Sequence, residues 1–417
     1  MNTTGSARPN RTTSRVALCL VLAALTPGVA SAVPGAPDTT FGPGGIRIDP
    51  AVLQLIREGN WLETVTTLSG NRIAVMTGYS WPDAGGRGVA RYLATGLPDT
   101  GFASAGHIGF LAWVDSSVQP PPALFTPPVI ARDGTMVTES GGRLVRYAPN
   151  GVQISATPTA TRVVPLALTP DGRIVARIDT PIPRVPATST VALFMPDGTR
   201  DPSFVPVVTG DPFGVAVKVA RGSVWVAWRA VAKPSGYSVR LVRRPLDGGA
   251  GMSSSVKVQS PSTWRKVGVI RRILVGPRGT ATLVGYARVG RAGVVTDQIL
   301  LIGVTATGSL DRDFGSSGLV TLPYTASAAR QRDGRIVVAW TRYVRKPSEH
   351  HELRVRRLTT SGHLDQTFPA RRFANVGALV AGMDLAIDDV GRTVIGVGSV
   401  PPESHYGGLM LIRLRAR

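Results

Sequence analysis

Five copies of the pattern Asp-x-x-Phe stand at regular distances along this chain of 417 residues. The steps between successive aspartates are 61, 102, 110 and 54 residues, so the two long steps are twice 51 and twice 55. A period of about 55 residues indicates a chain of similar units that must pack on one another. The copies begin at Asp38, Asp99, Asp201, Asp311 and Asp365 and end at Phe41, Phe102, Phe204, Phe314 and Phe368.

Two further features recur between these copies. A turn dipeptide precedes a short apolar run, as in Asp171-Gly172 and Asp333-Gly334, and such dipeptides favour tight hairpins because glycine accepts a positive φ. An alternating strand follows, with an arginine five residues before another turn glycine. This pair occurs in four units: Arg91 with Gly96, Arg146 with Gly151, Arg243 with Gly248 and Arg357 with Gly362.

Four short strands in each unit, without helical periodicity, predict an all-β fold: a seven-bladed β-propeller. An open solenoid of stacked sheets is the competing architecture. The ends of the repeat region favour a ring, because 45–49 read as the last strand of a unit and 409–415 as the third. Pairing of this N-terminal strand with the C-terminal blade would complete the seventh blade and remove two exposed edges.

The first 32 residues have the layout of a signal peptide. Three arginines precede a short apolar run, and Ala30-Ser31-Ala32 offers a cleavage site. We therefore expect residues 33–417 to form a single β-propeller domain that is secreted or extracytoplasmic in the cell envelope. We also expect no transmembrane segment after removal of the signal. Cys19 lies in the leader, so disulfides would not stabilise the processed chain.

The chain is strongly basic, with a net charge of +21, and the processed form keeps +18 after loss of the leader arginines. Such a balance suits acidic partners such as polyanions. The repeated strand arginines offer another explanation. In an alternating strand one side faces water, so these arginines are expected to form an outward row that spreads the charge over the solvated surface.

The sixth unit contains Leu310-Asp311-Arg-Asp-Phe314-Gly315-Ser-Ser-Gly318, then Asp333-Gly334-Arg335-Ile336 and Arg357-Leu358. At these residues the sequence resembles the delta-60 repeat family of bacterial exported repeat proteins. The resemblance extends over nearly all of 33–417 and is poor around 249–268. It implies a β-propeller and an exported location, and no established activity. The chain departs from the family pattern at Gly303, which replaces the strand arginine, and after Gly151 and Gly248, where Asp-x-x-Phe is missing.

Residues that recur in every unit are interpreted as scaffold, because a functional site is normally asymmetric. The aspartates are expected to accept backbone hydrogen bonds within their own turns. The phenylalanines are expected to fill the space between sheets. Topology places the hairpin turns and the Asp-x-x-Phe segments on one face of the ring and the variable loops on the other. Ligand binding is expected on the face with the variable loops.

Candidate ligand-binding residues come from three of these loops. Loops that combine histidine, tyrosine and arginine suit an anion or a sugar. Metal binding is not expected, since adjacent histidines in a strand point in opposite directions. No cofactor is expected either. The six candidates are Trp81, Arg345, His350, His351, His405 and Tyr406.

No recognised catalytic motif is present: Gly-x-Ser-x-Gly, His-Glu-x-x-His and the P-loop are all missing from the sequence. The sequence favours a non-catalytic binding or interaction scaffold for cell-envelope carbohydrate, a polyanion or a protein. Two alternatives stay open. One is a hydrolase or lyase that acts on polysaccharide, for which Asp49, Asp115 and Asp211 are the carboxylates to inspect. The other is electrostatic adhesion to polyanions.

Overall fold

The computed structural model describes most of the chain after residue 32. The described ranges are 33–49, 60–81, 84–113, 127–159, 161–179, 189–209, 214–230, 237–258, 264–291, 294–323, 325–345, 350–374, 376, 379–400 and 408–416. The chain divides into two compact units, Met1–Ala32 and Val33–Arg417. The first unit lies outside the described residues, so the signal peptide stays a prediction. Within the described ranges, no helix is long and apolar enough to cross a membrane.

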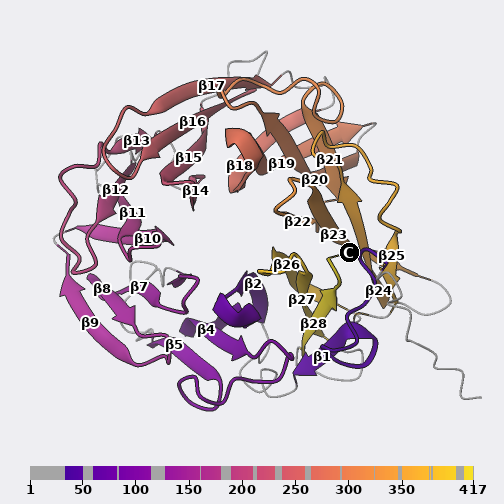
Figure 1. Cartoon of the computed structure of the whole chain (residues 1–417), viewed down its shortest axis with the longest axis horizontal. Helices are drawn as coiled ribbons and strands as arrows, with labels where there is room; N and C mark the ends of the chain where they lie inside the picture. Colours follow the sequence, from indigo (N-terminus) through magenta and orange to yellow (C-terminus); the bar gives the residue numbers. More distant parts are fainter. Residues whose placement is uncertain are drawn as a thin grey trace, which may run out of the picture. The chain divides into compact units, whose positions relative to one another are not determined.

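The unit Val33–Arg417 is all-β and consists of seven antiparallel four-stranded sheets around a common centre (Figure 1). The predicted seven-bladed β-propeller is therefore confirmed. In blades 1–6 the four strands follow one another along the chain, from the centre of the ring to its rim (Figure 1). Short 3-10 turns stand at η1 (Pro43–Gly45), η2 (Ser69–Asn71) and η3 (Pro277–Gly279).

The blades are numbered in chain order. Blade 1 contains β2 (Asn60–Thr67), β3 (Ile73–Trp81), β4 (Ala84–Tyr92) and β5 (His107–Trp113). Blade 2 contains β6 (Val129–Ile130), β7 (Met136–Ser140), β8 (Arg143–Tyr147) and β9 (Gln153–Pro158). Blade 3 contains β10 (Arg162–Leu168), β11 (Ile174–Asp179), β12 (Ser189–Phe194) and β13 (Val207–Thr209).

The remaining blades follow the same order, except that the last takes one strand from the start of the unit. Blade 4 contains β14 (Ala216–Ala220), β15 (Ser223–Ala230), β16 (Tyr237–Pro245) and β17 (Met252–Val258). Blade 5 contains β18 (Trp264–Val275), β19 (Ala281–Arg291), β20 (Val294–Val304) and β21 (Leu319–Pro323). Blade 6 contains β22 (Ser327–Arg330), β23 (Ile336–Val344), β24 (His350–Leu358) and β25 (Arg371–Phe373). Blade 7 contains β26 (Leu379–Ile387), β27 (Thr393–Val400), β28 (Gly408–Leu414) and β1 (Ile46–Asp49).

Blade 7 joins the two ends of the unit. β1 pairs antiparallel with β28, with Ile46 opposite Ile412 and Asp49 opposite Leu409. This pairing confirms the predicted closure, in which an N-terminal strand completes the C-terminal blade. It covers the outer edge of β28, which would otherwise be open to pairing with another chain.

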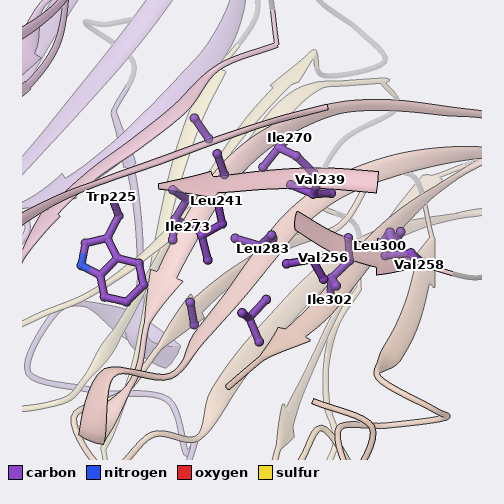
Figure 2. Packing of buried hydrophobic residues seen from close by; sticks show 14 residues of the cluster. Trp225, Val239, Leu241, Val256, Val258, Ile270, Ile273, Leu283, Leu300 and Ile302 are labelled. Atoms are coloured by element: carbon purple, nitrogen blue, oxygen red, sulfur yellow. The ribbon is translucent and has the colours of Figure 1, made fainter. Parts of the chain in front are cut away.

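The hydrophobic core lies between neighbouring blades. Between blades 4 and 5, Trp225 and Leu241 pack with Ile270 and Leu283, and all four are fully buried (Figure 2). Each blade is covered on both sides by its neighbours, so its second strand needs apolar residues on both sides. β23 is an example, because its first four residues, Ile336–Ala339, are all buried.

The ring has two different faces. One, called the turn face, carries the connections between first and second strands and between third and fourth strands of each blade. The other, called the loop face, carries the connections between second and third strands and between blades. The Asp-Gly hairpins lie on the turn face, and Gly172 and Gly334 there adopt positive φ values of 83° and 90°. All five Asp-x-x-Phe segments lie on the turn face too, as predicted.

The Asp-x-x-Phe segments pack as predicted. All five phenylalanines are buried. Phe314 lies under the turn glycine of the next blade, since a Cβ on Gly362 would be 2.9 Å from its ring. Four of the aspartates accept a hydrogen bond at 2.9–3.2 Å from the backbone N–H two residues later: Asp38, Asp201, Asp311 and Asp365.

The strand arginines do not form the expected outward row. Arg91, Arg357 and Arg413 are only 2–5% exposed. At the turn face, the chain folds back after each third strand. The Asp-x-x-Phe segment then covers the side of the strand that carries the arginine. Burial of a guanidinium requires a partner, and this segment supplies both a carboxylate and an aromatic ring. The Nε–Oδ2 distances are 2.8 Å for Arg91–Asp99, 2.7 Å for Arg357–Asp365 and 2.8 Å for Arg413–Asp38. The distances from the guanidinium carbon to the ring centroid are 4.4 Å for Arg91–Phe102, 4.9 Å for Arg357–Phe368 and 4.6 Å for Arg413–Phe41.

Blades that lack Asp-x-x-Phe give their arginine another partner. Arg146 donates to the carbonyl oxygen of Gly172 in the next blade at 3.0 Å. Arg243 donates from Nε to the Ser223 hydroxyl at 3.2 Å. The Arg413–Asp38 pair has a further function, because its two residues are 375 positions apart and join the ends of the ring.

Candidate functional site

A cavity of about 640 Å³ lies at the inner strands of blades 1–4. Thr64 and Lys218 line it from β2 and β14, on opposite ends of this arc of blades. β6 and β10 lie between them and contribute most of the apolar lining residues. The lining residues are Thr64, Thr66, Met76, Arg87, Pro127, Pro128, Val129, Ile130, Arg162, Val164, Pro165, Leu166, Ala167, Leu168, Arg177, Val217, Lys218 and Val219.

The short inner strand of blade 2 helps to explain where this cavity forms. β6 has two residues, whereas β2 has eight and β10 has seven. Side chains beyond the inner strands of blades 1 and 3 also line the cavity. They include Arg87 from β4 and Arg177 from β11.

Three arginines of the lining share two carboxylates. Arg87 pairs with Glu63, with Nε 2.8 Å from Oε1. Arg177 and Arg162 both pair with Asp179, at 2.7 Å and 3.7 Å. Arg162 is the looser partner of the two, so part of its guanidinium is left for another acceptor.

Lys218 differs from these arginines because it has no hydrogen bond or ion pair to any described residue. It is the third residue of β14 and lies between Val217 and Val219, with its side chain exposed to the cavity. Desolvation and, second, the positive charge of Arg272 lower the pKa of Lys218. An anion placed here would remove both penalties.

The cavity changes character along the ring axis. Arg162 opens β10 and stands opposite Asp179, the last residue of β11, so this pair lies at the loop face. Leu168 and Ile130 end β10 and β6 and lie toward the turn face. The charged end is therefore at the loop face, and the apolar end lies deeper.

A charged bridge links four blades next to this cavity. Asp384 on β26 accepts a hydrogen bond from Arg272 on β18 at 2.8 Å. The same oxygen, Oδ2, also accepts a hydrogen bond from the Thr64 hydroxyl on β2 at 2.9 Å. The other oxygen, Oδ1, accepts from the Ser327 hydroxyl on β22 at 2.7 Å. Burial would raise the pKa of Asp384, but Arg272 and these hydrogen bonds outweigh it and lower the pKa. The carboxylate is therefore ionised and fully engaged.

The predicted loop residues lie apart from this cavity where they are described. His350 and His351 begin β24 at the loop face of blade 6, and Arg345 follows β23. The ring of His351 lies 5.3 Å from that of Tyr343, between centroids. Desolvation and, second, the charge of His350 lower the pKa of His351. None of these residues lines the cavity.

The other predicted residues are less informative. Trp81 ends β3, and its side chain is outside the described part of the structure, as are His405 and Tyr406. Of the three carboxylates proposed for catalysis, Asp115 and Asp211 lie outside the described residues. Asp49 ends β1, the outermost strand of blade 7, and raises the pKa of the buried Tyr92 hydroxyl together with the larger effect of desolvation. It is not part of the cavity lining.

Sequence reasoning did not find this cavity. One signal was available for Lys218, which interrupts the otherwise apolar run Val215–Ala220 before a hairpin turn. A lone lysine in the first strand of a blade must face either the channel or a neighbouring blade. The arginines gave no comparable signal, because Arg87, Arg162 and Arg177 do not share a repeat position.

No family model matches the chain, and no curated protein matches it. Solved structures similar to it include the β-propeller domain of the Trilobed protease from Pyrococcus furiosus (9% identity, 86% of this chain and 97% of that one, TM-score 0.44). A mutant of the apocarotenoid oxygenase from Synechocystis has 10% identity over 81% of this chain and 87% of that one, with a TM-score of 0.43. The WD40 domain of SCAP from fission yeast has 10% identity over 89% and 98%, with a TM-score of 0.36. Similarities this distant carry no argument about function.

Proposed function

We propose that the processed chain is an exported, non-catalytic binding scaffold that takes an anionic ligand of the cell envelope. The loop face and the cavity that begins there form the binding side of the ring. One observation carries this proposal: four cations line the cavity, and only two carboxylates pair with them. Such a surplus in a partly desolvated space favours a negatively charged occupant.

The same observation weighs against a polysaccharide hydrolase. Hydrolysis of glycosides commonly uses two carboxyl groups that flank the scissile bond. Among the described residues that line the cavity, none is an aspartate or a glutamate. Glu63 and Asp179 are not part of the lining and are held in ion pairs by Arg87 and Arg177.

Binding to immobilised anionic polymers tests the proposal. Chain 33–417 is passed over heparin, polyphosphate and polygalacturonate, with neutral dextran as the reference matrix. We expect retention on the anionic matrices and its loss at high salt. Arg162→Met should weaken retention and leave Asp179 paired with Arg177. Arg200→Met, which removes an exposed arginine on the turn face, is the matched control.

Two outcomes would contradict the proposed function. Equal passage through dextran and all three anionic matrices would show that no anionic polymer is bound. Release of new reducing ends from polygalacturonate by chain 33–417 would replace the scaffold with the polysaccharide-active enzyme.

A further inference from the structure

The wall around Lys218 is mostly hydrophobic. Val217 and Val219 precede and follow Lys218 on β14, so they point to the other side of that strand, where they pack with Leu166 of β10 against the core between blades 3 and 4. All three are half-buried and, with Leu168, belong to the cavity lining. Twelve of the eighteen lining residues are apolar, four are cations and two are threonines. An inorganic ion would not need so much apolar surface, because a hydrated anion gains nothing from it.

We propose that the cavity binds a small amphiphilic organic anion, whose carboxylate or phosphate group contacts Lys218 and whose apolar body fills the inner part. This inference rests on the proposed function for the anionic character of the ligand. It adds the site and the chemical class of the occupant. The volume of about 640 Å³ lies within the range of about 300–1,000 Å³ that small-molecule sites in proteins occupy.

The composition of the wall argues against a neutral sugar. No aromatic side chain is among the described lining residues, so a pyranose ring has no flat surface to lie on. Asparagine and glutamine are likewise missing from this described lining, and they would supply the paired donors and acceptors that hydroxyl groups need. An alkyl or similar apolar body, by contrast, gains from each contact with Val217, Val219, Leu166 and Leu168.

Lys218 is the cation suited to the anionic group. The arginines at the loop face already contact Glu63 or Asp179. Arg272, the other cation near Lys218, is held by Asp384. A carboxylate next to Lys218 would therefore neutralise the one charge of this group that has no partner among the described residues.

Calorimetric titration of chain 33–417 tests the inference with four probes: decanoate, decyl phosphate, decanol and inorganic phosphate. We expect the two amphiphilic anions to bind more tightly than decanol and inorganic phosphate. Lys218→Met should weaken decanoate binding about tenfold or more. Lys257→Met is the matched control, because Lys257 is exposed on the outer strand β17, and it should bind decanoate as the unaltered chain does.

The pH dependence of binding gives a second readout. Arg272, held by Asp384, is the charged group that acts on Lys218 directly. The other charged groups of the cavity are Arg162, Arg177 and Arg87, with their partners Asp179 and Glu63. Decanoate affinity should fall in the alkaline range as Lys218 loses its proton. Lys218→Arg should remove this fall and keep the affinity.

Three results would overturn the inference. Unchanged decanoate affinity in Lys218→Met would show that the anionic group lies elsewhere. Equal affinities for decanol and decanoate would remove the need for an anion, and equal affinities for inorganic phosphate and decanoate would remove the need for an apolar body. If heparin retention persists in any of these cases, the proposed function stands while the inference fails. If no anion of any kind is bound, both fail.

Discussion

The turn face and the central cavity use positive charge in opposite ways. On the turn face, Arg91, Arg357 and Arg413 each meet a carboxylate from an Asp-x-x-Phe segment, and the arrangement repeats around the ring. In the cavity, Lys218 has no carboxylate among the described residues, and Arg162 shares one with Arg177. Repeated and neutralised charge belongs to the scaffold. Unrepeated surplus charge marks the place where a ligand would complete the electrostatics.

The two regions also differ in what their ion pairs connect. Arg413 and Asp38 fasten the ends of the chain within one blade, where both side chains are almost fully buried. Arg272 and Asp384 connect blades 5 and 7 near the centre, where Arg272 is 34% exposed. Water in the centre of the ring can hydrate Arg272 but not Arg413. Loss of a partner should therefore cost more on the turn face than in the channel.

The largest expected effect is that of Asp38→Asn. Asparagine can keep the turn around Thr40, but it cannot neutralise Arg413, whose buried charge would be left uncompensated. We expect the free energy of unfolding to fall by about 3–5 kcal/mol, measured by urea denaturation followed through tryptophan fluorescence. Asp197→Asn is the control, since Asp197 is an exposed turn aspartate that bonds Thr199. Equal stability of the two variants would mean that the buried ion pair between Asp38 and Arg413 contributes no more than the hydrogen bonds of an exposed turn aspartate.

A smaller loss is expected for Asp384→Asn. This change leaves Arg272 without its carboxylate, but water in the centre of the ring still hydrates part of the guanidinium. We expect the free energy of unfolding to fall by about 2 kcal/mol in the same urea experiment. A loss larger than that of Asp38→Asn would reverse the comparison and make the centre, not the closing blade, the more sensitive region.

The loss of stability in acid should reveal what the carboxylates of Asp38 and Asp384 contribute to the free energy of unfolding. Burial would raise the pKa of Asp38, but the hydrogen bond from Thr40 and the charges of Arg413 and Arg392 outweigh it, and the pKa is lowered. The pKa of Asp384 is lowered by a similar balance. Because both folded pKa values lie below the unfolded value of 3.8, this stability is complete above that value and disappears as the pH falls through the folded pKa values.

The measurement is the midpoint of thermal unfolding as a function of pH. The unaltered chain should lose stability steeply below about pH 4. The Asp38→Asn/Asp384→Asn double variant should be less stable at neutral pH and show a shallower acid slope. Parallel curves for the two proteins would mean that other groups control acid unfolding.

The smallest effect, and one of opposite sign, is expected for Lys218→Met. The pKa of Lys218 is lowered in the folded chain, so the unfolded chain binds this proton more tightly just below pH 10.5. Stability of the unaltered chain should therefore rise with pH in that range. Lys218→Met should lack this rise and be slightly more stable at neutral pH, since no charge has to be held there. Urea denaturation at several pH values, with Lys257→Met as the control, measures both effects. A destabilised Lys218→Met would mean that this lysine contributes to the fold.

The features that sequence reasoning predicted correctly are local and periodic. The number of blades follows from the spacing of the five aspartates. The closing strand follows because 45–49 read as a fourth strand without the rest of its unit, and 409–415 read as a third strand without a fourth. The burial of Phe41 and its four counterparts follows from repetition in an apolar position. Each of these depends on contacts that every unit makes in the same way, so a single repeat contains the information.

The strand arginines were interpreted wrongly for a physical reason. Alternation shows that Arg91 and Arg357 point away from the apolar side of their strands, but it does not show what covers the other side. The partner aspartates, Asp99 and Asp365, stand eight residues after these arginines. The segment between each arginine and its aspartate has to fold back for the ion pair to form. That return of the chain is a tertiary feature. The candidates on the loop face, such as His350 and Arg345, stay predictions.

The sequence by itself determined the all-β class, the seven repeats, the ring closure and the two unlike faces, because each is repeated or complementary in the chain. Only the tertiary structure decided where charge is neutralised and where it is left over. The cavity is lined by side chains from four blades that share no position in the repeat. Such a meeting of unrelated positions has no period, so it becomes visible only when the ring is closed.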